Sequence, residues 1–444
     1  MTLIKIDKTY DVKLSGQPSL DVDSLPLQPI HGLHPYRIPN ITPKLLIKEN
    51  DSVKIGTPLF FDKKQPEVVF SSPVAGKVTQ IVFGPRRRID KIEITTTESQ
   101  EAEVLDVPDV SSERVSLVQS ICKAGLWGAF RTFPFQAIAK IDATPSLIVL
   151  SVDNDEPHHP NSSIILDKYL DEFKKGLSVL NALSENKVVV GISSTNNDGR
   201  AALGSLITHV IEGDYPANDP GVLLYKVKTS VKENSAWTLT LQEVVRLGQL
   251  FLTKTYPSKR IVCLAGAKAI KPRHFEVIQG TPVRAVVGDV DESATRLISG
   301  GVFTGTKISN DDFIGFYDDA LHCLQESGEQ EFMAFMTPGF NKASYSRAFM
   351  SSLFKKPSWA LSSLINGGER ACIECGYCEE VCPVDLTPQA VMKRLAGKDI
   401  ESALDFGLLD CVDCGLCTYV CPSKIELGDL FLKTKSTLLK EVEK

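Results

Sequence analysis

The sequence predicts a multidomain α/β chain that ends in a small helical module rich in cysteine. Its 444 residues exceed what one hydrophobic core usually organises. Segments of strand character come first, strands then alternate with amphipathic helices, and eight of the 11 cysteines fall between positions 372 and 421. We therefore expect an extended N-terminal segment, three sheet-containing domains and a cysteine-rich module, in that order.

The composition is that of an ordinary globular protein, with 43% apolar and 23% charged residues. A net charge of -6 disfavours a nucleic-acid partner, because phosphate binding requires a basic surface. The start, "MTLIKIDKTYDVKLSG", alternates like a strand and lacks the apolar core of a targeting segment. The most apolar stretches, such as "SLIVLSV", are shorter than the roughly 20 residues that span a bilayer. We expect no transmembrane segment, and cysteines that are free or metal-bound rather than disulfide-bonded.

Residues 1–28 are expected to form an extended segment and residues 29–98 a barrel-sandwich domain. The succession "VKIGTPL", a turn and "SPVAGKV" resembles the fold of lipoyl and biotinyl domains. Those domains carry a modified lysine on a hairpin, near the place of Asp62, Lys63 and Lys64. Because "QPEVV" follows here instead of small residues, we interpret this stretch as a charged turn. The basic run Arg86, Arg87 and Arg88 is interpreted as a solvated loop or protein contact, with a phosphate or lipid-headgroup site as the alternative.

Residues 99–255 are expected to form a Rossmann-like α/β domain. "SLIVLSVD" and "KVVVGISST" have the pattern of buried strands, and strands that alternate with helices indicate a parallel sheet. Between these strands, apolar residues recur at spacings of three and four, which predicts one buried helix face. The residues of that face are Leu166, Leu170, Phe173, Leu177 and Leu180.

A nucleotide site on such a sheet requires a glycine-rich turn at a helix N-terminus. The best candidate, "AGLWGAFRTFPF", holds only Gly125 and Gly128 and places Trp127, Phe130 and Arg131 beside them. Large side chains would prevent close approach of a phosphate to the backbone. We therefore favour loss of the nucleotide site.

Residues 256–345 return to short strands with glycine turns, such as "KRIVCLAGA" and "RLISGGVFTG", and predict a β-grasp-like domain. Neither a Ser-His-Asp set nor a pair of carboxylates stands out, so no catalytic residue is predicted. His158 and His159 are expected in a surface loop. The isolated cysteines, Cys122, Cys263 and Cys323, are expected in the core.

Residues 346–444 hold two copies of the spacing C-x2-C-x2-C-x3-C-P, which is typical of bacterial two-cluster ferredoxins. Glycine after the second cysteine leaves room for close backbone approach to an inorganic cluster. In this architecture the fourth cysteine of each copy ligates the other cluster. The sequence therefore predicts two [4Fe–4S] clusters, the first on Cys372, Cys375, Cys378 and Cys421, and the second on Cys411, Cys414, Cys417 and Cys382.

Structural zinc is the alternative, but zinc sites use two C-x2-C pairs and need neither a third thiol nor the trailing proline. Helices are predicted between the cysteine sets. Thr387 and Pro388 mark a helix start and Gly397 a stop, while Asp399 and Gly407 bracket a second helix. These features indicate a helical ferredoxin-like module. Acidic neighbours of the thiols are expected to lower the cluster potentials; these are Glu374, Glu379, Glu380, Asp410 and Asp413.

Several motifs resemble one protein family nearly end to end: "DKKQPEVVFSSPVAGKV", "AGLWGAFRTFPF", "LGQLFLTKTYPSKRIVCLAGAKAIKPR", "RLISGGVFTG", "MTPGFNKASYSR" and "CTYVCPSKIELG". The chain resembles the subunit designated A of the Na+-translocating NADH:quinone oxidoreductase. The resemblance implies a peripheral subunit on the cytoplasmic side of the bacterial inner membrane. It also implies membrane and peripheral partner subunits of the same redox complex, and a role in delivering electrons to quinone near the membrane partner. The family fold is related to the flavin- and NADH-binding subunit of respiratory complex I, with the flavin site lost.

One departure from that family is the pair of complete cysteine sets, which resembles the subunit designated C of the Rnf complex. That relative exchanges electrons between ferredoxin and NAD through a flavin and two [4Fe–4S] clusters. Its glycine-rich flavin loop is not matched here, which argues against FMN and NAD binding by this chain.

Three functions remain open from the sequence. The first is a peripheral electron-transfer subunit of a sodium-pumping NADH:quinone oxidoreductase, inactive by itself. The second is an electron-entry subunit of the Rnf type, with its own flavin and NAD sites. The third is a non-catalytic docking subunit with structural clusters.

Overall fold

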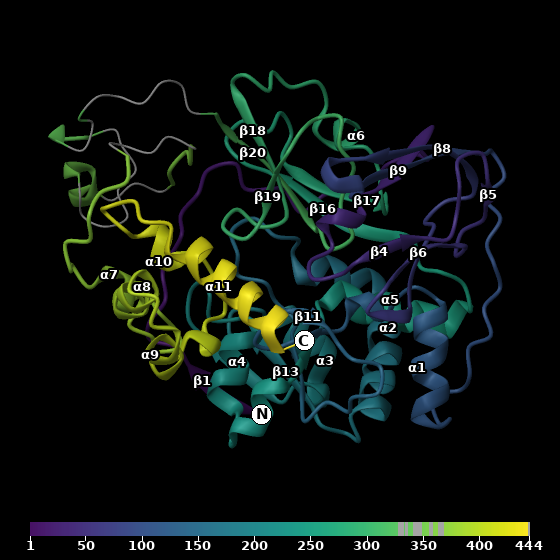
Figure 1. Ribbon diagram of the computed structural model, residues 1–444, viewed down its shortest axis with the longest axis horizontal. Coiled ribbons are helices and arrows are strands. Elements are labelled where there is room, and N and C mark those ends of the chain that lie inside the picture. Colours follow the sequence, from purple (N-terminus) through teal and green to yellow (C-terminus); the bar gives the residue numbers. More distant parts are fainter. Residues whose placement is uncertain (327–332, 334–335, 341–348, 355–357, 363–367, 443–444) are drawn as a thin grey trace.

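The structure is a computed structural model that describes residues 1–326, 333, 336–340, 349–354, 358–362 and 368–442 (Figure 1). The predicted boundary between the third domain and the cysteine-rich module, at residues 345–346, lies outside the described residues, as does part of the motif "MTPGFNKASYSR". Within the described part, no helix is long and apolar enough to cross a bilayer.

The N-terminal part contains two antiparallel sheets packed face to face, in the strand orders β3-β9-β8-β5 and β4-β6-β7. Alternate residues point inward, as the two-residue period of a strand requires, so that Ile92 and Ile94 are fully buried. Phe60 and Phe70 stack between strands, with ring centroids 4.8 Å apart. The turn after Asp62 is confirmed as a charged turn, and Asp62 accepts the Thr42 N–H at 2.8 Å. The strands are β3 (Ile30–Leu33), β4 (Pro43–Leu45), β5 (Ser52–Val53), β6 (Pro58–Asp62), β7 (Gln65–Ser71), β8 (Gly76–Phe83) and β9 (Ile89–Thr96).

A seven-stranded sheet forms the centre of the second part, in the order β1-β14-β13-β12-β15-β10-β11. The five strands from β1 to β15 are parallel, and β10 and β11 continue the sheet in antiparallel fashion. Both strands predicted from sequence are confirmed, as β12 and β13. The strands are β1 (Thr2–Lys5), β10 (Arg131–Thr132), β11 (Ala137–Ile138), β12 (Ile148–Ser151), β13 (Val188–Ser193), β14 (His209–Glu212) and β15 (Trp237–Thr238).

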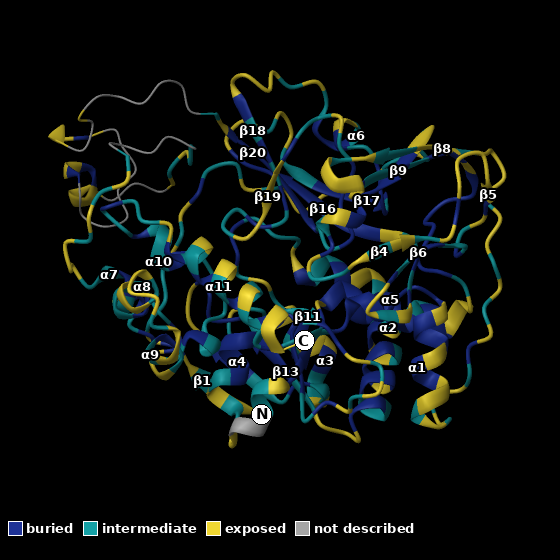
Figure 2. Cartoon of the chain, in the orientation of Figure 1, coloured by how far each residue is buried: buried dark blue, intermediate teal, exposed yellow. Residues whose placement is uncertain are grey.

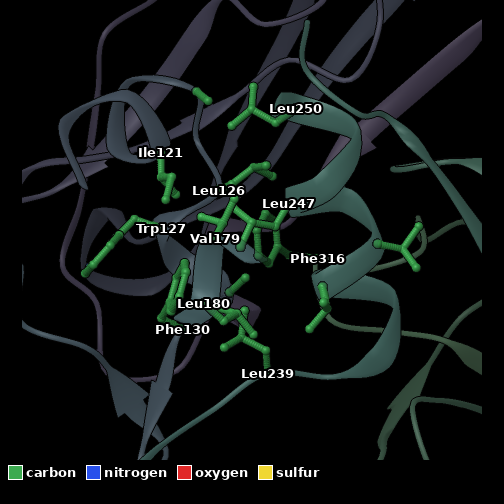
Figure 3. Close-up of a cluster of buried hydrophobic side chains, with 14 of the residues drawn as sticks. Ile121, Leu126, Trp127, Phe130, Val179, Leu180, Leu239, Leu247, Leu250 and Phe316 are labelled. Carbon is green, nitrogen blue, oxygen red and sulfur yellow. The ribbon is translucent and has the colours of Figure 1, made fainter. Parts of the chain in front are cut away.

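The helices of this part cover the sheet and carry its main core. The apolar face predicted between the two strands lies on α2, where Leu166, Phe173, Leu177 and Leu180 are buried and Leu170 is partly buried against the core. Figure 3 shows Leu180 of this face in one cluster with Leu247 and Leu250 of α5 and with Trp127 and Phe130. The helices are α1 (Arg114–Lys123), α2 (Ser162–Leu183), α3 (Asn197–Leu203), α4 (Pro220–Val227) and α5 (Leu241–Thr253).

Two glycines allow α2 and α5 to pack closely. A Cβ atom on Gly248 would lie 1.7 Å from the carbonyl oxygen of Glu172, and one on Gly176 would lie 2.0 Å from that of Val244. The helix backbones therefore touch with no side chain between them. This close contact fixes α5, whose N-terminus follows β15 at the carboxyl edge of the sheet.

The third part is a six-stranded mixed sheet in the order β19-β18-β20-β16-β17-β2. Its edge strand β2 comes from the N-terminal segment, whose other strand, β1, pairs with β14 of the seven-stranded sheet. The extended segment therefore connects both sheets. The elements are β2 (Val22–Ser24), β16 (Lys259–Ala265), β17 (Arg273–Ile278), α6 (Val283–Val287), β18 (Thr295–Ser299), β19 (Thr306–Ile308) and β20 (Ala320–Gln325).

Buried ion pairs join this sheet to α5. Glu243 pairs with Arg246 at 3.0 Å and with Arg260 at 3.1 Å, and Arg260 also pairs with Asp319 at 2.7 Å. Each charge in this network has an oppositely charged partner, as burial requires.

The C-terminal part is a helical module at the left of Figure 1, from which α11 extends across the body. The predicted helix caps are confirmed: α8 has Thr387 as N-cap and Gly397 as C-cap, and Asp399 caps α9 by accepting the Ser402 N–H at 3.1 Å. The helices are α7 (Tyr377–Glu380), α8 (Pro388–Ala396), α9 (Ile400–Asp405), α10 (Leu416–Tyr419) and α11 (Leu427–Val442).

Burial follows the layers in Figure 2, with the sheets and inner helix faces buried and the outer faces of the helices exposed. The three isolated cysteines are buried, as predicted. Short 3-10 helices occur at η1 (Pro35–Arg37), η2 (Pro85–Arg87), η3 (Trp127–Ala129), η4 (Gly204–Leu206), η5 (Val231–Ser235), η7 (Met350–Leu353) and η8 (Leu408–Asp410).

Candidate functional site

The first set of cysteines surrounds one small recess in the C-terminal module. Its lining includes Cys372, Cys375, Cys378 and Cys421, with Gln389 beside them. Burial and, to a smaller extent, the nearby thiols of Cys375 and Cys421 raise the pKa of Cys378 to about 11. The fourth cysteine of the second repeat therefore lies with the first three of the first repeat, as the crossed arrangement expects.

The second set lies deeper, against the body of the protein. Burial raises the pKa of Cys414 well above its ordinary value, and the charges of Cys417, Cys411 and Cys382 raise it further. Burial also raises the pKa of Cys417 to about 12, with Cys382 the next contribution. Four thiols that resist ionisation in this way need a cation to become ligands, and bound iron can supply that charge.

The two cysteine sets are the groups of thiols available to hold a metal centre. Among the residues that the structure describes, no three His, Cys, Asp or Glu side chains converge closely enough to hold one ion. Tetrahedral zinc draws four thiolates onto one atom, whereas an iron–sulfur cube spreads them around its corners. All eight cysteines are free thiols. The donor set, two groups of four thiols, therefore fits [4Fe–4S] clusters.

The two repeats follow the same backbone path. Gly376 has φ = 81° and precedes α7, and Gly415 has φ = 76° and precedes α10. The residue two positions after the first cysteine is also left-handed in both copies, at Glu374 and Asp413. A side chain on either glycine would be strained in this conformation. The repeat seen in the sequence is thus a repeat of the structure.

Lysines offset several of the acidic residues near the thiols. Lys435 on α11 is buried, pairs with Asp413 at 2.6 Å and donates to the Cys411 carbonyl oxygen at 2.9 Å. Lys228 pairs with Asp410 at 2.5 Å. Lys393 pairs with Glu374. The sequence-based expectation counted only the acidic side chains, because these lysines lie far from them in the chain.

Lys435 could have been found from the sequence. The buried residues of α11 are Leu427, Phe431, Lys435 and Leu439, four residues apart along one face. A lysine in such an apolar stripe indicates a buried cation that requires a partner.

Three aromatic rings join the second cysteine set to the body, and we call Tyr215, Phe303 and Tyr419 the aromatic wall. Phe303 stacks on Tyr215 with centroids 5.4 Å apart and meets Tyr419 edge-on at 4.7 Å. Tyr215 Oη donates to the Cys414 carbonyl oxygen at 2.6 Å. The wall thus combines residues from the α/β part, the six-stranded sheet part and the module.

A cavity of about 1010 Å³ is lined by this wall and by Asp413 and Gly415 of the second cysteine loop. It opens beyond the carboxyl ends of β12 and β15, where ligands bind in open α/β sheets. Ser151, Asn218 and Thr238 line it and each has a buried side-chain oxygen without a hydrogen-bond partner. The polar residues of the cavity therefore have free hydrogen-bonding capacity.

The cavity is strongly acidic. Its lining includes Asp153, Asp155, Glu156 and Asp219, while Arg131 contributes a positive charge. Burial, together with neighbouring carboxylates, raises the pKa of Asp155 to about 6 and that of Asp219 to about 7. Such a field disfavours phosphate groups.

The structure around the cavity changes two predictions made from the sequence, one about the glycine turn and one about the paired histidines. Trp127 and Phe130 do not crowd the glycine turn but point into the core, while Gly125 and Gly128 give room to Ser71 and Phe70 of β7. The expectation of a surface loop at His158 and His159 is wrong. His159 lines the cavity with a side chain only 11% exposed, 3.5 Å from Glu156, because the loop is covered by the six-stranded sheet part.

Comparisons with known proteins agree with this architecture. Residues 4–97 match the NqrA N-terminal barrel-sandwich hybrid domain, and residues 112–256 match the NqrA second alpha/beta domain. Residues 261–310 match the NQRA C-terminal domain, and residues 371–425 match a 4Fe-4S dicluster domain. The chain is therefore a multidomain α/β protein with a barrel-sandwich N-terminal domain and a helical 4Fe-4S region.

Relatives extend over nearly the whole chain. The subunit designated A of the Na(+)-translocating NADH-quinone reductase from Neisseria gonorrhoeae (strain ATCC 700825 / FA 1090) is 30% identical over 448 residues, covering 99% of this chain and 100% of that protein. Its counterpart from Aliivibrio salmonicida (strain LFI1238) is 32% identical over 419 residues, 92% of each chain. The chain belongs to the NqrA family, whose members form the subunit designated A of the Na(+)-translocating NADH-quinone reductase.

Proposed function

We propose that the chain is a peripheral electron-transfer subunit of a membrane-bound Na+-translocating NADH:quinone oxidoreductase. Its relatives carry the name of that complex, which implies further subunits. The observation that carries the electron-transfer role is the pair of cysteine sets on the same backbone path, within a 4Fe-4S dicluster region. A [4Fe–4S] cluster supplies one-electron redox chemistry.

The residues of the chain hold the clusters and control their surroundings. In this proposal Cys372, Cys375, Cys378 and Cys421 ligate the first cluster, and Cys411, Cys414, Cys417 and Cys382 the second. Gln389, 3.1 Å from Cys378 Sγ, orients a ligand of the first. Lys435 and Tyr215 fix the backbone carbonyls of Cys411 and Cys414 beside the second. Such outer contacts orient ligands and tune a metal centre.

The proposal places the chain on the cytoplasmic side of the bacterial inner membrane, with electrons delivered to quinone near a membrane partner. FMN and NAD are not bound by this chain in the proposal. Support comes from the acidic lining of the cavity, where carboxylates such as Asp153 and Glu156 would repel a cofactor phosphate. The glycines of the candidate phosphate turn are also used for packing against β7.

The finer fold assignments belong to the same proposal. Residues 1–28 form the extended segment, 29–98 the barrel-sandwich domain, 99–255 a Rossmann-like domain, 256–345 a β-grasp-like domain, and 346–444 the two-cluster module. The parallel strands β14-β13-β12-β15 support the Rossmann-like assignment. The mixed sheet with the short helix α6 supports the β-grasp-like assignment.

The test uses the full chain, purified and reconstituted without oxygen, and the assembled complex. We expect the isolated chain to give two reduced-cluster signals with dithionite and none with NADH alone, because it lacks a site for NADH. Tight binding of FMN together with reduction by NADH would favour the Rnf-type function. Substitution of Cys375 or Cys414 by serine should lower quinone reduction by the complex. Unchanged turnover would leave only a docking role.

A further inference from the structure

Phe303 lies where the cavity meets the second cysteine set. Its ring is packed between Tyr215 and Tyr419, and all three residues line the cavity. Cys414 belongs to the same cluster of packed side chains. Asp413 and Gly415 of the cysteine loop also line the cavity, whereas none of the four cysteines of the second set does, so the aromatic wall covers Cys414 beside a loop that the cavity already reaches.

The contact with the cysteine loop is close. A Cβ atom on Gly415 would lie 3.3 Å from Cβ of Phe303, so the ring-bearing residue rests on the backbone next to Cys414. Tyr215 holds the same loop by its 2.6 Å hydrogen bond to the Cys414 carbonyl oxygen. Loss of the Phe303 ring would extend the cavity from the backbone of this loop toward Cys414.

Glu156 fixes the position of Phe303. Its carboxylate accepts the backbone N–H of Phe303 at 2.6 Å and that of Thr304 at 3.0 Å, and it also accepts the Thr304 hydroxyl at 2.8 Å. Gly301 makes this possible, because a Cβ atom there would lie 1.8 Å from the carboxylate. Burial acts to raise the pKa of Glu156, but contacts with His159, Phe303 and Thr304 hold it below its ordinary value. The carboxylate is thus ionised when it holds the loop.

We propose that Phe303, held by Glu156, is a positioning residue that keeps cavity water away from the second cysteine set and thereby sets the reduction potential of its cluster. The inference rests on the proposed function, because it requires a cluster at Cys382, Cys411, Cys414 and Cys417. A reduced cluster carries one more negative charge, and nearby water stabilises that charge. Exclusion of water by Phe303 keeps the potential low.

The experiment compares full-length chains reconstituted without oxygen, in redox titrations followed by electron paramagnetic resonance. The variants are Phe303→Ala, the conservative Phe303→Tyr, and Phe83→Ala, which removes a ring that is 49% exposed on β8. A Cys375→Ser chain, which lacks a ligand of the first set only, identifies the signal of the second. Phe303→Ala should raise the reduction equilibrium constant of the second cluster on the order of tenfold, which is about 59 mV for one electron. In Phe303→Ala the potential of the first cluster should not change. In Phe303→Tyr and Phe83→Ala both clusters should keep their wild-type potentials.

A second measurement follows the release of iron to a chelator. In Phe303→Ala we expect the half of the iron held by the second set to be released on the order of tenfold faster. Loss of about 1.4 kcal/mol of packing free energy raises the equilibrium constant for local opening of the module tenfold. Glu156→Gln should also speed the release of iron, but by less. The Phe303 ring is still present in this variant, and only the hydrogen bonds to the backbone of Phe303 and Thr304 are weakened. If Phe303→Ala does not assemble, Phe303→Leu takes its place in both measurements.

The outcomes separate the inference from the proposed function. A wild-type chain without two titrating clusters would remove the proposed function itself. Two clusters in the wild type, with the second potential unchanged in Phe303→Ala, would overturn the inference alone. Equal shifts of both potentials would also overturn it, since they would indicate general loosening of the module.

Discussion

Lys435 shows how one residue depends on its surroundings. It is a lysine within the apolar face of α11, its side chain is 3% exposed, and Asp413 is its ion-pair partner. The energetic cost of burying both charges is offset by their attraction and by the bond to the Cys411 carbonyl oxygen. The charge of the lysine therefore stabilises the fold only while that partner is present.

Replacement of Lys435 by Met should destabilise the module by about 2–4 kcal/mol, because Asp413 would remain largely buried without a partner. Hydrogen exchange of the α11 amides in the reconstituted chain measures this loss. Lys433→Met on the same helix is the matched control, since its side chain is 75% exposed and pairs with Asp429 on the surface. Equal protection of α11 in both variants would show that the buried pair contributes nothing.

Asp155 provides a prediction for the effect of pH. Burial raises its pKa from 3.8 to about 6, so the folded state binds the proton more tightly than the unfolded state does. The wild type therefore loses stability from this group as pH rises between about 4 and 6, by about 3 kcal/mol in total. Roughly half of this loss falls between pH 5 and pH 8.

The Asp155→Asn chain lacks this titration, so its stability relative to the wild type should rise by about 1.5 kcal/mol between pH 5 and pH 8. Urea unfolding followed by the fluorescence of the buried Trp127 and Trp237 reports on this part of the protein. Asp171→Asn, at an exposed position of α2, is the matched control for loss of an aspartate charge. A pH-independent difference for Asp155→Asn would contradict the raised pKa.

At the scale of elements, local sequence patterns predicted individual helices and strands well. The caps Thr387 and Asp399 and the five-residue apolar face of α2 depend on neighbouring residues and were found from the sequence. The pairing of β1 with one sheet and β2 with another was not predicted, because partners such as β14 and β17 are distant in the chain. The orientation of Trp127 into the core was missed for the same reason.

The close packing of α2 on α5 leads to a third prediction. Gly248→Ala places a methyl group against the Glu172 carbonyl oxygen, so the helices must separate, at a cost of about 1–3 kcal/mol or more. Urea unfolding with tryptophan fluorescence measures the change. Gly397→Ala is the control, because the nearest atom to its new Cβ would be the Arg394 carbonyl oxygen at 3.4 Å. A Gly248→Ala chain as stable as that control would exclude this contact as a determinant of the fold.

At the scale of the whole molecule, the module and the body form one structure around the aromatic wall and the cavity. The eight thiols were predicted from their spacing, which is a local property. Glu156, Phe303 and Tyr215 were not, because they come from separate parts of the chain and only the fold brings them to the second set. The acidic cavity was missed as well, since its carboxylates are scattered through the sequence.

The crossed arrangement of the thiols gives a fourth prediction. Cys421 lines the recess of the first set, although it belongs to the second repeat. Cys421→Ser should therefore remove the first cluster and leave the second, and Cys382→Ser should do the reverse. Electron paramagnetic resonance of the reduced chains shows which signal is lost. If each variant lost the cluster of its own repeat, the crossed assignment would be wrong.

The redox role proposed for this chain requires its eight C-terminal thiols to hold two iron–sulfur clusters. Their presence is measured by the iron, sulfide and zinc content of the full-length chain after anaerobic reconstitution. We expect about eight iron and eight sulfide per chain, with no zinc. Zinc in place of iron, or clearly fewer than eight iron after complete reconstitution, would contradict that role.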